Sequence, residues 1–209
     1  MPRQAIRSHV RPAIVFTAAL IVITGLVYPG VVAAIARVAF PSQANGSLVR
    51  RGDAIVGSAL IGQQFAAPQY FHSRPSAAGN GYDAANSSGT NKGPTDRKLA
   101  DTLIAQAVDK AVKEDGATKG SIPADYVTSS ASGLDPHISP ASAELQVARV
   151  ATARGVDAAR VRALVAQHTE GRQFGFLGEP RVNVLMLNIA LDSAFKQPAA
   201  PATPVSPSK

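Results

Sequence analysis

The longest apolar run in the chain lies close to its N-terminus. It covers residues 13–36, AIVFTAALIVITGLVYPGVVAAIA, and contains no charged residue. The hydrocarbon core of a bilayer is spanned by about 20 apolar residues in a helix that rises about 1.5 Å per residue. Pro29 and Gly30 do not exclude such a helix, because membrane helices tolerate both residue types. The run therefore predicts one transmembrane helix over residues 13–36.

Two alternatives to a retained membrane anchor are a cleaved signal peptide and a buried core helix. Ala34-Ile35-Ala36 resembles a signal cleavage site. The apolar region of a signal peptide is only about 7–15 residues long, however, which is shorter than this run. Long uncharged runs are also uncommon in soluble domains. We therefore expect an uncleaved anchor.

Charges on either side of the run predict its orientation. Arg3, Arg7 and Arg11 precede the run, and no acidic residue occurs before Asp53. Positively charged flanks remain in the cytoplasm. The anchor is therefore expected to lie in the cell inner (plasma) membrane. Residues 1–12 are expected on its cytoplasmic side. The contrast is reduced by three arginines that follow the run: Arg37, Arg50 and Arg51.

Short apolar runs after the anchor predict strands. Beyond a polar connector at 41–52, Ala54-Ile55-Val56 and Ala59-Leu60-Ile61 flank Gly57-Ser58. This pattern is typical of two strands separated by a turn or bulge. A further extended stretch is predicted at 122–128.

Helical periodicity and helix-boundary residues predict four later helices. Residues 96–114 alternate an apolar and a charged face. Ser139 followed by Pro140 is a helix start, because a hydroxyl cap precedes a proline at the first helical position. That helix is expected to end before Gly155. The remaining two are 158–168, capped by Asp157, and 182–195, which is helical by length but whose residues 182–184 can instead form a strand.

Two long loops and a tail complete the pattern, at 63–96, 129–139 and 197–209. A loop as long as 63–96 is functional, packed on a partner or disordered, and its aromatic residues argue against disorder. The proline-rich tail is expected to be disordered. The fold class predicted is α+β: one N-terminal transmembrane helix followed by a single small extracytoplasmic (periplasmic) α/β domain, residues 41–196, with several helices and short strands.

Charge distribution argues against nucleic-acid binding, and cysteine content excludes disulfides and thiol chemistry. The net charge of +7 arises largely from arginines near the anchor and from Lys209, since residues 41–197 contain 16 basic and 14 acidic side chains. No basic stripe interleaves with aromatic residues, so nucleic acid is not an expected partner. The chain has no cysteine, which excludes disulfides and thiolate catalysis.

One spacing suggests hydrolytic chemistry. Asp135, His137 and Ser139 alternate, so an extended backbone places them on one face. A membrane-anchored periplasmic hydrolase using these three residues is therefore an alternative function. A triad requires the histidine to bridge the nucleophile and the acid. Residues this close in sequence more often fix a loop, and Ser139 already has a role as a helix cap.

Other cofactor signals are weak. The histidines lack the spacing of a metal site, and the G-x-x-x-x-G-K-[ST] phosphate-binding pattern is absent. We expect no catalytic residue, no metal ligand and no tightly bound cofactor in this chain. Asn183 and Asn188 stand out in an apolar segment, where they are either satisfied buried amides or contacts with a partner chain.

A set of motifs in fixed order resembles a known family. The motifs are Leu60-Ile61-Gly62-Gln63; Tyr70-Phe71 with Arg74-Pro75-Ser76-Ala77; Ser88-Gly89-Thr90-Asn91 with Gly93-Pro94; residues 132–140, SGLDPHISP; Arg149-Val150-Ala151 with Ala153-Arg154-Gly155; and Val182-Asn183-Val184-Leu185 with Leu187-Asn188. In this order they resemble the C subunit of the Kdp-type potassium-transporting ATPase. The resemblance covers about residues 10–195. The family commonly has Gly-Gly-Ser-Asn where this chain has Ser88-Gly89-Thr90-Asn91.

The resemblance implies an accessory subunit that is not itself an enzyme. The family is described as necessary for assembly and as a catalytic chaperone that raises the ATP affinity of the pump subunit, hence the association with ATP and nucleotide binding. The implied partners are a channel-like potassium-selecting subunit, a P-type ATP-hydrolysing subunit, a small single-span subunit and the lipid bilayer. The complex uses ATP, Mg and K+. An outward domain does not meet cytoplasmic ATP, so we expect an effect on the pump to pass through subunit contacts.

The candidate site residues are polar or aromatic positions that either contact a partner or fix a loop: Gln63, Tyr70, Phe71, Arg74, Ser76, Asn91, Asp135, His137, Arg149, Asn183 and Asn188. Within loop 63–96 we predict that Tyr70, Phe71 and Arg74 anchor the loop on the potassium-selecting subunit, because aromatics and arginine are enriched among interface hot spots. The alternative is a loop folded back on its own domain.

Overall fold

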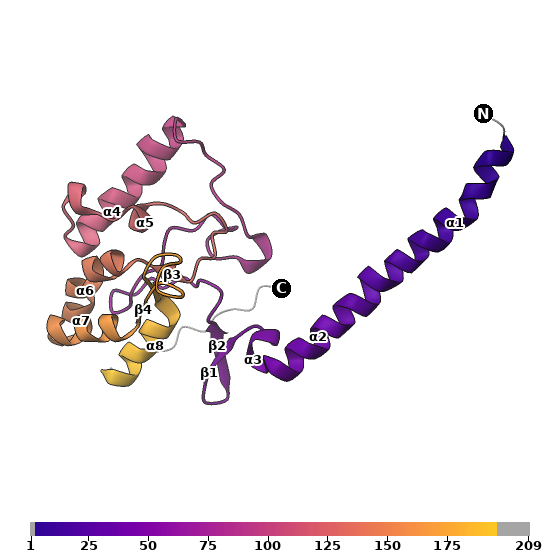
Figure 1. Cartoon of the computed structure of the whole chain (residues 1–209). Helices are drawn as coiled ribbons and strands as arrows, with labels where there is room; N and C mark the ends of the chain where they lie inside the picture. Colours follow the sequence, from indigo (N-terminus) through magenta and orange to yellow (C-terminus); the bar gives the residue numbers. More distant parts are fainter. Residues whose placement is uncertain (1–2, 196–209) are drawn as a thin grey trace. The chain divides into compact units, whose positions relative to one another are not determined.

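The computed structural model describes the backbone of residues 3–195 and the side chains of residues 9–195 (Figure 1). The chain divides into two compact units, Met1–Val56 and Gly57–Lys209, which we describe separately. The side chains of Arg3 and Arg7, and the tail at 197–209, lie outside the described residues. Within those residues, one long apolar helix precedes a domain of helices and short strands, which confirms the predicted α+β class.

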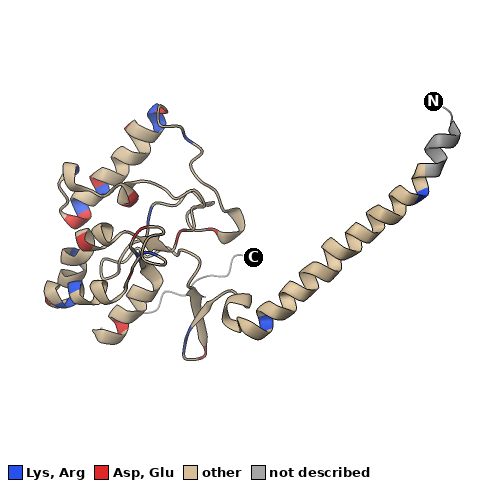
Figure 2. Ribbon diagram, in the orientation of Figure 1, with Lys and Arg blue, Asp and Glu red and all other residues tan. Residues whose placement is uncertain are grey.

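The first unit is dominated by one long helix. Its parts are α1 (Arg3–Val22), a π-helical turn η1 (Ile23–Val27) and α2 (Tyr28–Ala39). The stretch His9–Ala39 is long and apolar enough to cross a membrane and buries none of its side chains in the protein. In its described side chains, Figure 2 shows basic residues only toward the two ends, Arg11 and Arg37. The helix is thus longer than the predicted 13–36.

The π-helical turn lies directly before Pro29. The N–H of Tyr28 bonds the carbonyl of Ile23, five residues back. Proline has no N–H to continue the usual ladder. One wider turn at this point lets the helix pass the proline without ending, as π-bulges do elsewhere.

The polar connector contains regular structure that the sequence pattern did not predict. A short helix α3 (Pro41–Ala44) is followed by strand β1 (Leu48–Arg51), which pairs with β2 (Ala54–Ser58). The predicted second strand at 59–61 is wrong, because these residues form a turn in which the Ile61 N–H bonds the Ser58 carbonyl at 3.3 Å. The strand that pairs with β2 is instead β1, which lies in the connector before it. The turn between the two strands contains Gly52, whose φ of +62° favours glycine.

The core of the second unit is built from three helices and a small sheet. Helices α6 (Pro140–Arg154), α7 (Ala158–Gln167) and α8 (Val184–Ala194) pack together through apolar faces. The sheet has the order β3-β5-β4, all antiparallel: β3 (His137–Ile138), β5 (Arg181–Asn183) and β4 (Thr169–Glu170). The fully buried side chains include Phe71, Val147, Val150, Val161, Val182, Leu187 and Leu191.

The helix caps of this core agree with the sequence. Ser139 accepts a bond from the Ser142 N–H at 3.0 Å, and Asp157 accepts one from the Ala159 N–H at 2.7 Å. Gly155 ends α6 with φ +64°. The alternative of a strand start at 182–184 is correct for residues 182 and 183, which belong to β5, and wrong for Val184, which begins α8. Strands β3 and β4 were not predicted, since each spans only two residues.

The remaining elements lie between the first strands and α6. The predicted helix 96–114 is present as a π-helical stretch η3 (Leu99–Ile104) and α4 (Ala105–Asp115), and it ends at the left-handed Gly116. The extended stretch predicted at 122–128 is wrong in part: Pro123 is extended, but it starts the short helix α5 (Ala124–Val127). Proline suits this boundary because it has no N–H to contribute. Residues 119–121 form a 3₁₀ turn, η4 (Lys119–Ser121).

Loop 63–96 has almost no regular structure, as predicted. Its one short element is the 3₁₀ turn η2 (Ala84–Asn86), capped by Asp83. The loop is nevertheless described throughout, and several of its side chains are buried in the domain. What positions the candidate site is therefore how this loop is held.

Candidate functional site: a loop held by buried polar side chains

Two buried amide side chains hold the loop backbone at Phe71 and His72. Asn188 of α8 accepts a bond from the Phe71 N–H at 2.8 Å and donates one to the Phe71 carbonyl at 2.9 Å. Gln146 of α6 makes the same pair with His72, at 2.7 and 3.1 Å. An amide has one acceptor and two donors, so it satisfies both backbone groups of one residue, as a neighbouring strand does. The helices thus substitute for a strand partner.

Phe71 fills the core as a result of this backbone capture. Its side chain is 0% exposed and belongs to the main apolar cluster with Val147, Leu187 and Leu191. Phe71 therefore fixes the loop to its own domain. As an exposed anchor for a partner subunit it is excluded, because a fully buried ring offers no surface.

Arg149 joins the loop to two helices. Its guanidinium donates to the carbonyls of Pro68 and Tyr70 at 2.7 and 2.9 Å, and to the carboxylate of Asp115 at 2.7 Å. The Arg149 and Asp115 side chains are 8% and 0% exposed. Asp115 also accepts a short bond from the hydroxyl of Tyr126. Removing one member would leave a buried charge without its partner, which is costly.

A second arginine, Arg154, also joins the loop backbone to a helix, in this case α8. Arg154 donates to the carbonyl of Gln69 at 2.7 Å and to Asp192 at 2.9 Å. Its guanidinium carbon lies 5.0 Å from the ring centre of Tyr70, whose hydroxyl also bonds Asp192 at 3.1 Å. Tyr70 is half-buried and tied to α8, so it too fixes the loop.

Arg74 connects loop 63–96 to loop 129–139. It donates to the Asp135 carboxylate at 3.0 Å and lies 3.4 Å from the Thr128 carbonyl. Burial raises the pKa of Asp135, but bonds from His137 and the charge of Arg74 outweigh it, so the pKa lies below its usual value. The hydroxyl of Tyr82 bonds the Arg74 carbonyl, and burial raises the pKa of Tyr82 to about 12. The two loops are therefore one interlocked structure.

Ser76 adds a second connection between the loops. Its hydroxyl donates to the Gly133 carbonyl at 2.6 Å and accepts from the backbone N–H of Tyr82 at 2.8 Å. Gly133 has φ +68°, and a Cβ there would lie 2.6 Å from the Ser88 carbonyl oxygen. No larger residue fits this approach, which explains the glycine in the SGLDPHISP motif.

The alternating Asp135, His137 and Ser139 do not form a Ser–His–Asp relay. The His137 Nδ1 lies 3.6 Å from Asp135, but the Ser139 hydroxyl donates to Asp125 at 2.9 Å and caps α6. Its hydrogen is therefore directed to Asp125 and not to an imidazole. Asp135 accepts from the His137 backbone N–H at 2.9 Å, the arrangement of a loop-fixing aspartate.

The remaining candidates also have structural partners or lie at the surface. Asn183 donates to the Ala59 carbonyl at 2.8 Å and caps α8 through the Met186 N–H at 3.1 Å, so both apolar-segment asparagines are satisfied amides. The Gln63 carbonyl accepts from the Ser73 hydroxyl at 3.1 Å. Asn91 is exposed and has φ +52°.

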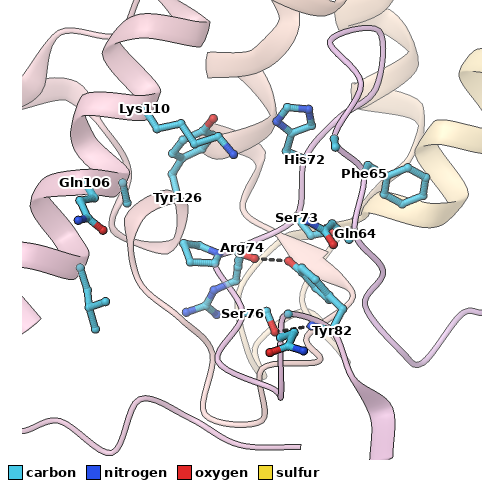
Figure 3. A pocket seen from close by; sticks show the side chains of 16 residues that line it. Gln64, Phe65, His72, Ser73, Arg74, Ser76, Tyr82, Gln106, Lys110 and Tyr126 are labelled. Carbon is cyan, nitrogen blue, oxygen red and sulfur yellow. Dashed lines mark hydrogen bonds between the residues drawn. The ribbon is translucent and has the colours of Figure 1, made fainter. Parts of the chain in front are cut away.

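A cavity of about 410 Å³ lies between the loop and the helix η3–α4 (Figure 3). Its lining includes His72, Arg74, Lys110 and Tyr126, with polar and apolar groups mixed. The pKa of His72 is lowered, first by burial and then by the charge of Arg149. Within residues 9–195 no three His, Cys, Asp or Glu side chains gather as metal ligands do.

Sequence reasoning missed several members of this network: Asp115, Tyr126, Gln146, Arg154 and Asp192. Gln146 had a usable signal, because it lies on the same α6 face as Ala143, Val147 and Val150, where a polar side chain needs a buried partner. Its partner lies 74 residues away in sequence, so the pairing had no local signature.

Most of this chain is similar in sequence to known proteins. A profile of the family described as "K+-transporting ATPase, c chain" matches residues 10–193. A Gemmatimonas aurantiaca protein named "Potassium-transporting ATPase KdpC subunit" is 64% identical over 186 residues, which are 88% of this chain and 92% of the relative. Proteins of the same name from Koribacter versatilis and Rhodospirillum rubrum are 53% and 54% identical, over 89% and 88% of this chain and 95% of each relative. The chain therefore belongs to the KdpC family, as an accessory subunit of the Kdp K+-transporting ATPase complex.

Proposed function

We propose that this chain is a non-catalytic scaffold of its complex, held in the membrane by its N-terminal helix and needed for assembly and stability. The observation that supports the proposal is that polar residues of the family motifs serve to hold the loops of the domain in place. Arg74, Ser76, Asp135, Arg149 and Asn188 all hold loops in place through bonds to backbone or to each other. These groups give the domain a fixed surface and leave no nucleophile–base pair at the Asp135–Ser139 segment.

The orientation we propose places residues 1–12 in the cytoplasm and the domain outside. The chain has no cysteine, so one cysteine introduced at a time reports its own location. Arg162→Cys changes an exposed side chain of α7, and Ser8→Cys directly precedes the apolar stretch His9–Ala39. A membrane-impermeant maleimide should label Arg162→Cys in intact spheroplasts and Ser8→Cys only after lysis. The reverse labelling would refute this orientation.

The partners we propose are a potassium-selecting subunit, a P-type ATP-hydrolysing subunit and a small single-span subunit. An effect on ATP affinity would be a coupling free energy carried by subunit contacts, since an outward domain does not reach cytoplasmic ATP. The contact predicted for loop 63–96 now rests on its exposed residues, of which 91–95 form the longest run, because Phe71 is buried.

The experiment that tests this function compares the purified complex with and without this chain. Omission should lower the yield of intact complex and raise the KM for ATP in K+-dependent hydrolysis. A photoreactive ATP analogue should label the ATP-hydrolysing subunit and leave this chain unlabelled. Labelling of this chain that competes with ATP would overturn the proposed indirect effect, and hydrolysis of esters or peptides by the chain alone would overturn the non-catalytic assignment.

A further inference from the structure

The hairpin between β4 and β5 ends in an exposed apolar tip, which we define as residues 173–177. Its sequence is Gln-Phe-Gly-Phe-Leu. Phe174 is 87% exposed, Phe176 is 70% exposed and Leu177 is 47% exposed. Outside the long N-terminal helix, these two phenylalanines are the most exposed large apolar side chains among the described residues. Single exposed apolar residues are ordinary, but three within five residues form a patch.

The tip is an ordered turn. Gln173 and Leu177 exchange two backbone hydrogen bonds, each at 2.9 Å, and the Phe176 N–H bonds the Gln173 carbonyl at 3.2 Å. Its base continues into the paired strands β4 and β5. The backbone N–H groups of Gln173, Gly175, Phe176 and Leu177 are thus bonded within the hairpin, and the two rings are held outward by a defined turn.

Phe174 is an unfavourable residue for this turn. In the β-turn 173–176, which the Phe176 N–H closes, Phe174 and Gly175 have φ of +53° and +81°, and positive φ at both central positions is the combination that a type I′ turn requires. Such turns prefer Asn-Gly, because asparagine tolerates the left-handed region and bulky side chains do not. A strained residue that does not pack into its own domain points to a use outside that domain.

Charges around the tip are paired with each other. Arg172 contacts Glu179 at 2.7 Å, and Arg181 contacts Glu170 at 2.9 Å. The tip is therefore apolar with a charge-neutral rim. Binding to a lipid surface is favoured by unpaired basic residues, which this rim lacks. An apolar centre with a polar rim is instead the arrangement of a protein interface.

We propose that Phe174 and Phe176 insert into an apolar pocket on the outer face of another subunit of the same Kdp complex. The inference rests on the proposed function, because it requires the domain to lie outside beside its partners. The patch is too small to hold a free dimer: each ring buries about 150–250 Å², whereas a stable interface buries about 800 Å² on each partner. A small hot spot is sufficient for a partner that shares the membrane, since tethering raises the effective concentration.

The test uses the whole complex, purified through a tag on the ATP-hydrolysing subunit. The measured quantity is the amount of this chain recovered per tagged subunit. Phe174→Asn combined with Phe176→Ser should reduce recovery by about tenfold or more, as loss of a hot spot does. Phe176→Leu, which keeps an apolar side chain, should retain most of it. Arg162→Ser, an exposed position on α7, is the matched surface control and should recover fully.

A second measurement separates docking from folding. Phe174→Asn alone creates the preferred Asn-Gly turn, so it should raise the melting temperature of the full chain in detergent while lowering its recovery with the complex. A residue that only maintained the fold would move both quantities in the same direction. Equal recovery of the wild type and the double variant would overturn the inference and leave the proposed function intact. Failure of the wild type itself to be recovered would overturn both.

The occupant is identified by a photo-crosslinking amino acid at position 176. A covalent adduct with another subunit of the complex supports the proposal. Adducts only with lipid, or only with a second copy of this chain, would overturn it.

Discussion

Two irregular segments of the domain contain aromatic residues in a polar context, yet they direct them oppositely. In loop 63–96 the Phe71 ring is 0% exposed, whereas in the tip at 173–177 the Phe174 ring is 87% exposed. The difference lies in what satisfies the backbone. Side chains from α6 and α8 bond the backbone of Phe71 and His72, which draws the loop into the domain. The tip satisfies its own backbone, so its side chains are free to point outward.

An aromatic residue in a loop can therefore have one of two roles. A loop whose backbone depends on groups from elsewhere becomes part of the core, and its aromatics stabilise the fold. A hairpin that closes its own hydrogen bonds gains little stability from exposed rings, so those rings are available for another molecule.

The largest expected effect is the loss of the Phe71 ring. Phe71→Ala should lower the free energy of unfolding by about 3–5 kcal/mol, because a large cavity remains in a packed core. The matched variant Phe176→Ala should change it by less than about 0.5 kcal/mol, since an exposed side chain buries little. Thermal unfolding of the full chain in detergent, followed by circular dichroism, measures both. Similar losses in the two variants would break the comparison.

The next effect comes from the amide that captures the loop. Asn188→Ala leaves the N–H and C=O of Phe71 buried without partners, and each unsatisfied group costs about 1–3 kcal/mol. We expect a loss of about 2–6 kcal/mol in urea-induced unfolding, the sum for the two groups. Asn86→Ala removes an exposed amide that bonds Asp83 and serves as the control, with a change below about 0.5 kcal/mol. An Asn188→Ala variant as stable as its control would show that the backbone bonds contribute little.

A smaller effect is expected where the second loop meets α6. Ser139→Ala removes the hydroxyl that caps the helix and bonds Asp125, and should cost about 1 kcal/mol. Ser139→Asn is the variant expected to restore stability, because it keeps a capping acceptor without adding charge. Ser139→Asp also keeps an acceptor, but it places a second negative charge beside Asp125. Loss of complex activity in Ser139→Ala with unchanged stability and assembly would instead indicate chemistry at this position.

The smallest effect concerns pH. His72 lies beside Arg149 of α6 and beside Lys110 and Glu114 of α4, and its pKa in the folded chain is below the usual value of 6.5. The unfolded chain therefore binds the proton more readily, so the stability contributed by neutral His72 is present above about pH 6.5 and declines as the pH falls below it. His72→Gln should flatten the decrease in melting temperature between pH 7.5 and 5.5. An unchanged pH profile in this variant would exclude His72 as the group responsible.

Local patterns predicted a large part of the fold. The apolar helix, the caps at Ser139 and Asp157 and the glycine stop at Gly155 are all read from residues that are neighbours in the sequence. The errors occurred where pairing was decided elsewhere. Residues 59–61 are as apolar as 54–56, but the strand partner of the latter is the polar segment 48–51, and a preference for extended backbone does not say which segment pairs.

The candidate site divides in the same way. Composition and motifs identified Arg74, Asp135, Arg149 and Asn188 as candidates. They did not distinguish contact with a partner from fixing a loop. Their roles became visible through contacts that join residues 61 to 117 positions apart, such as Arg74 with Asp135 and Phe71 with Asn188. No local periodicity encodes such a contact, because it depends on how the helices pack.

Local hydrophobicity, capping chemistry and motif order are enough to define the membrane-length helix, the helix boundaries and the family. That Phe71 lies in the core while Phe174 and Phe176 lie at the surface follows from the packing of the folded domain. Both segments contain glycine, polar residues and aromatics, so the residue types present do not separate the two cases. The deciding factor is the source of the hydrogen bonds to the backbone, which comes from α6 and α8 in one case and from the hairpin itself in the other.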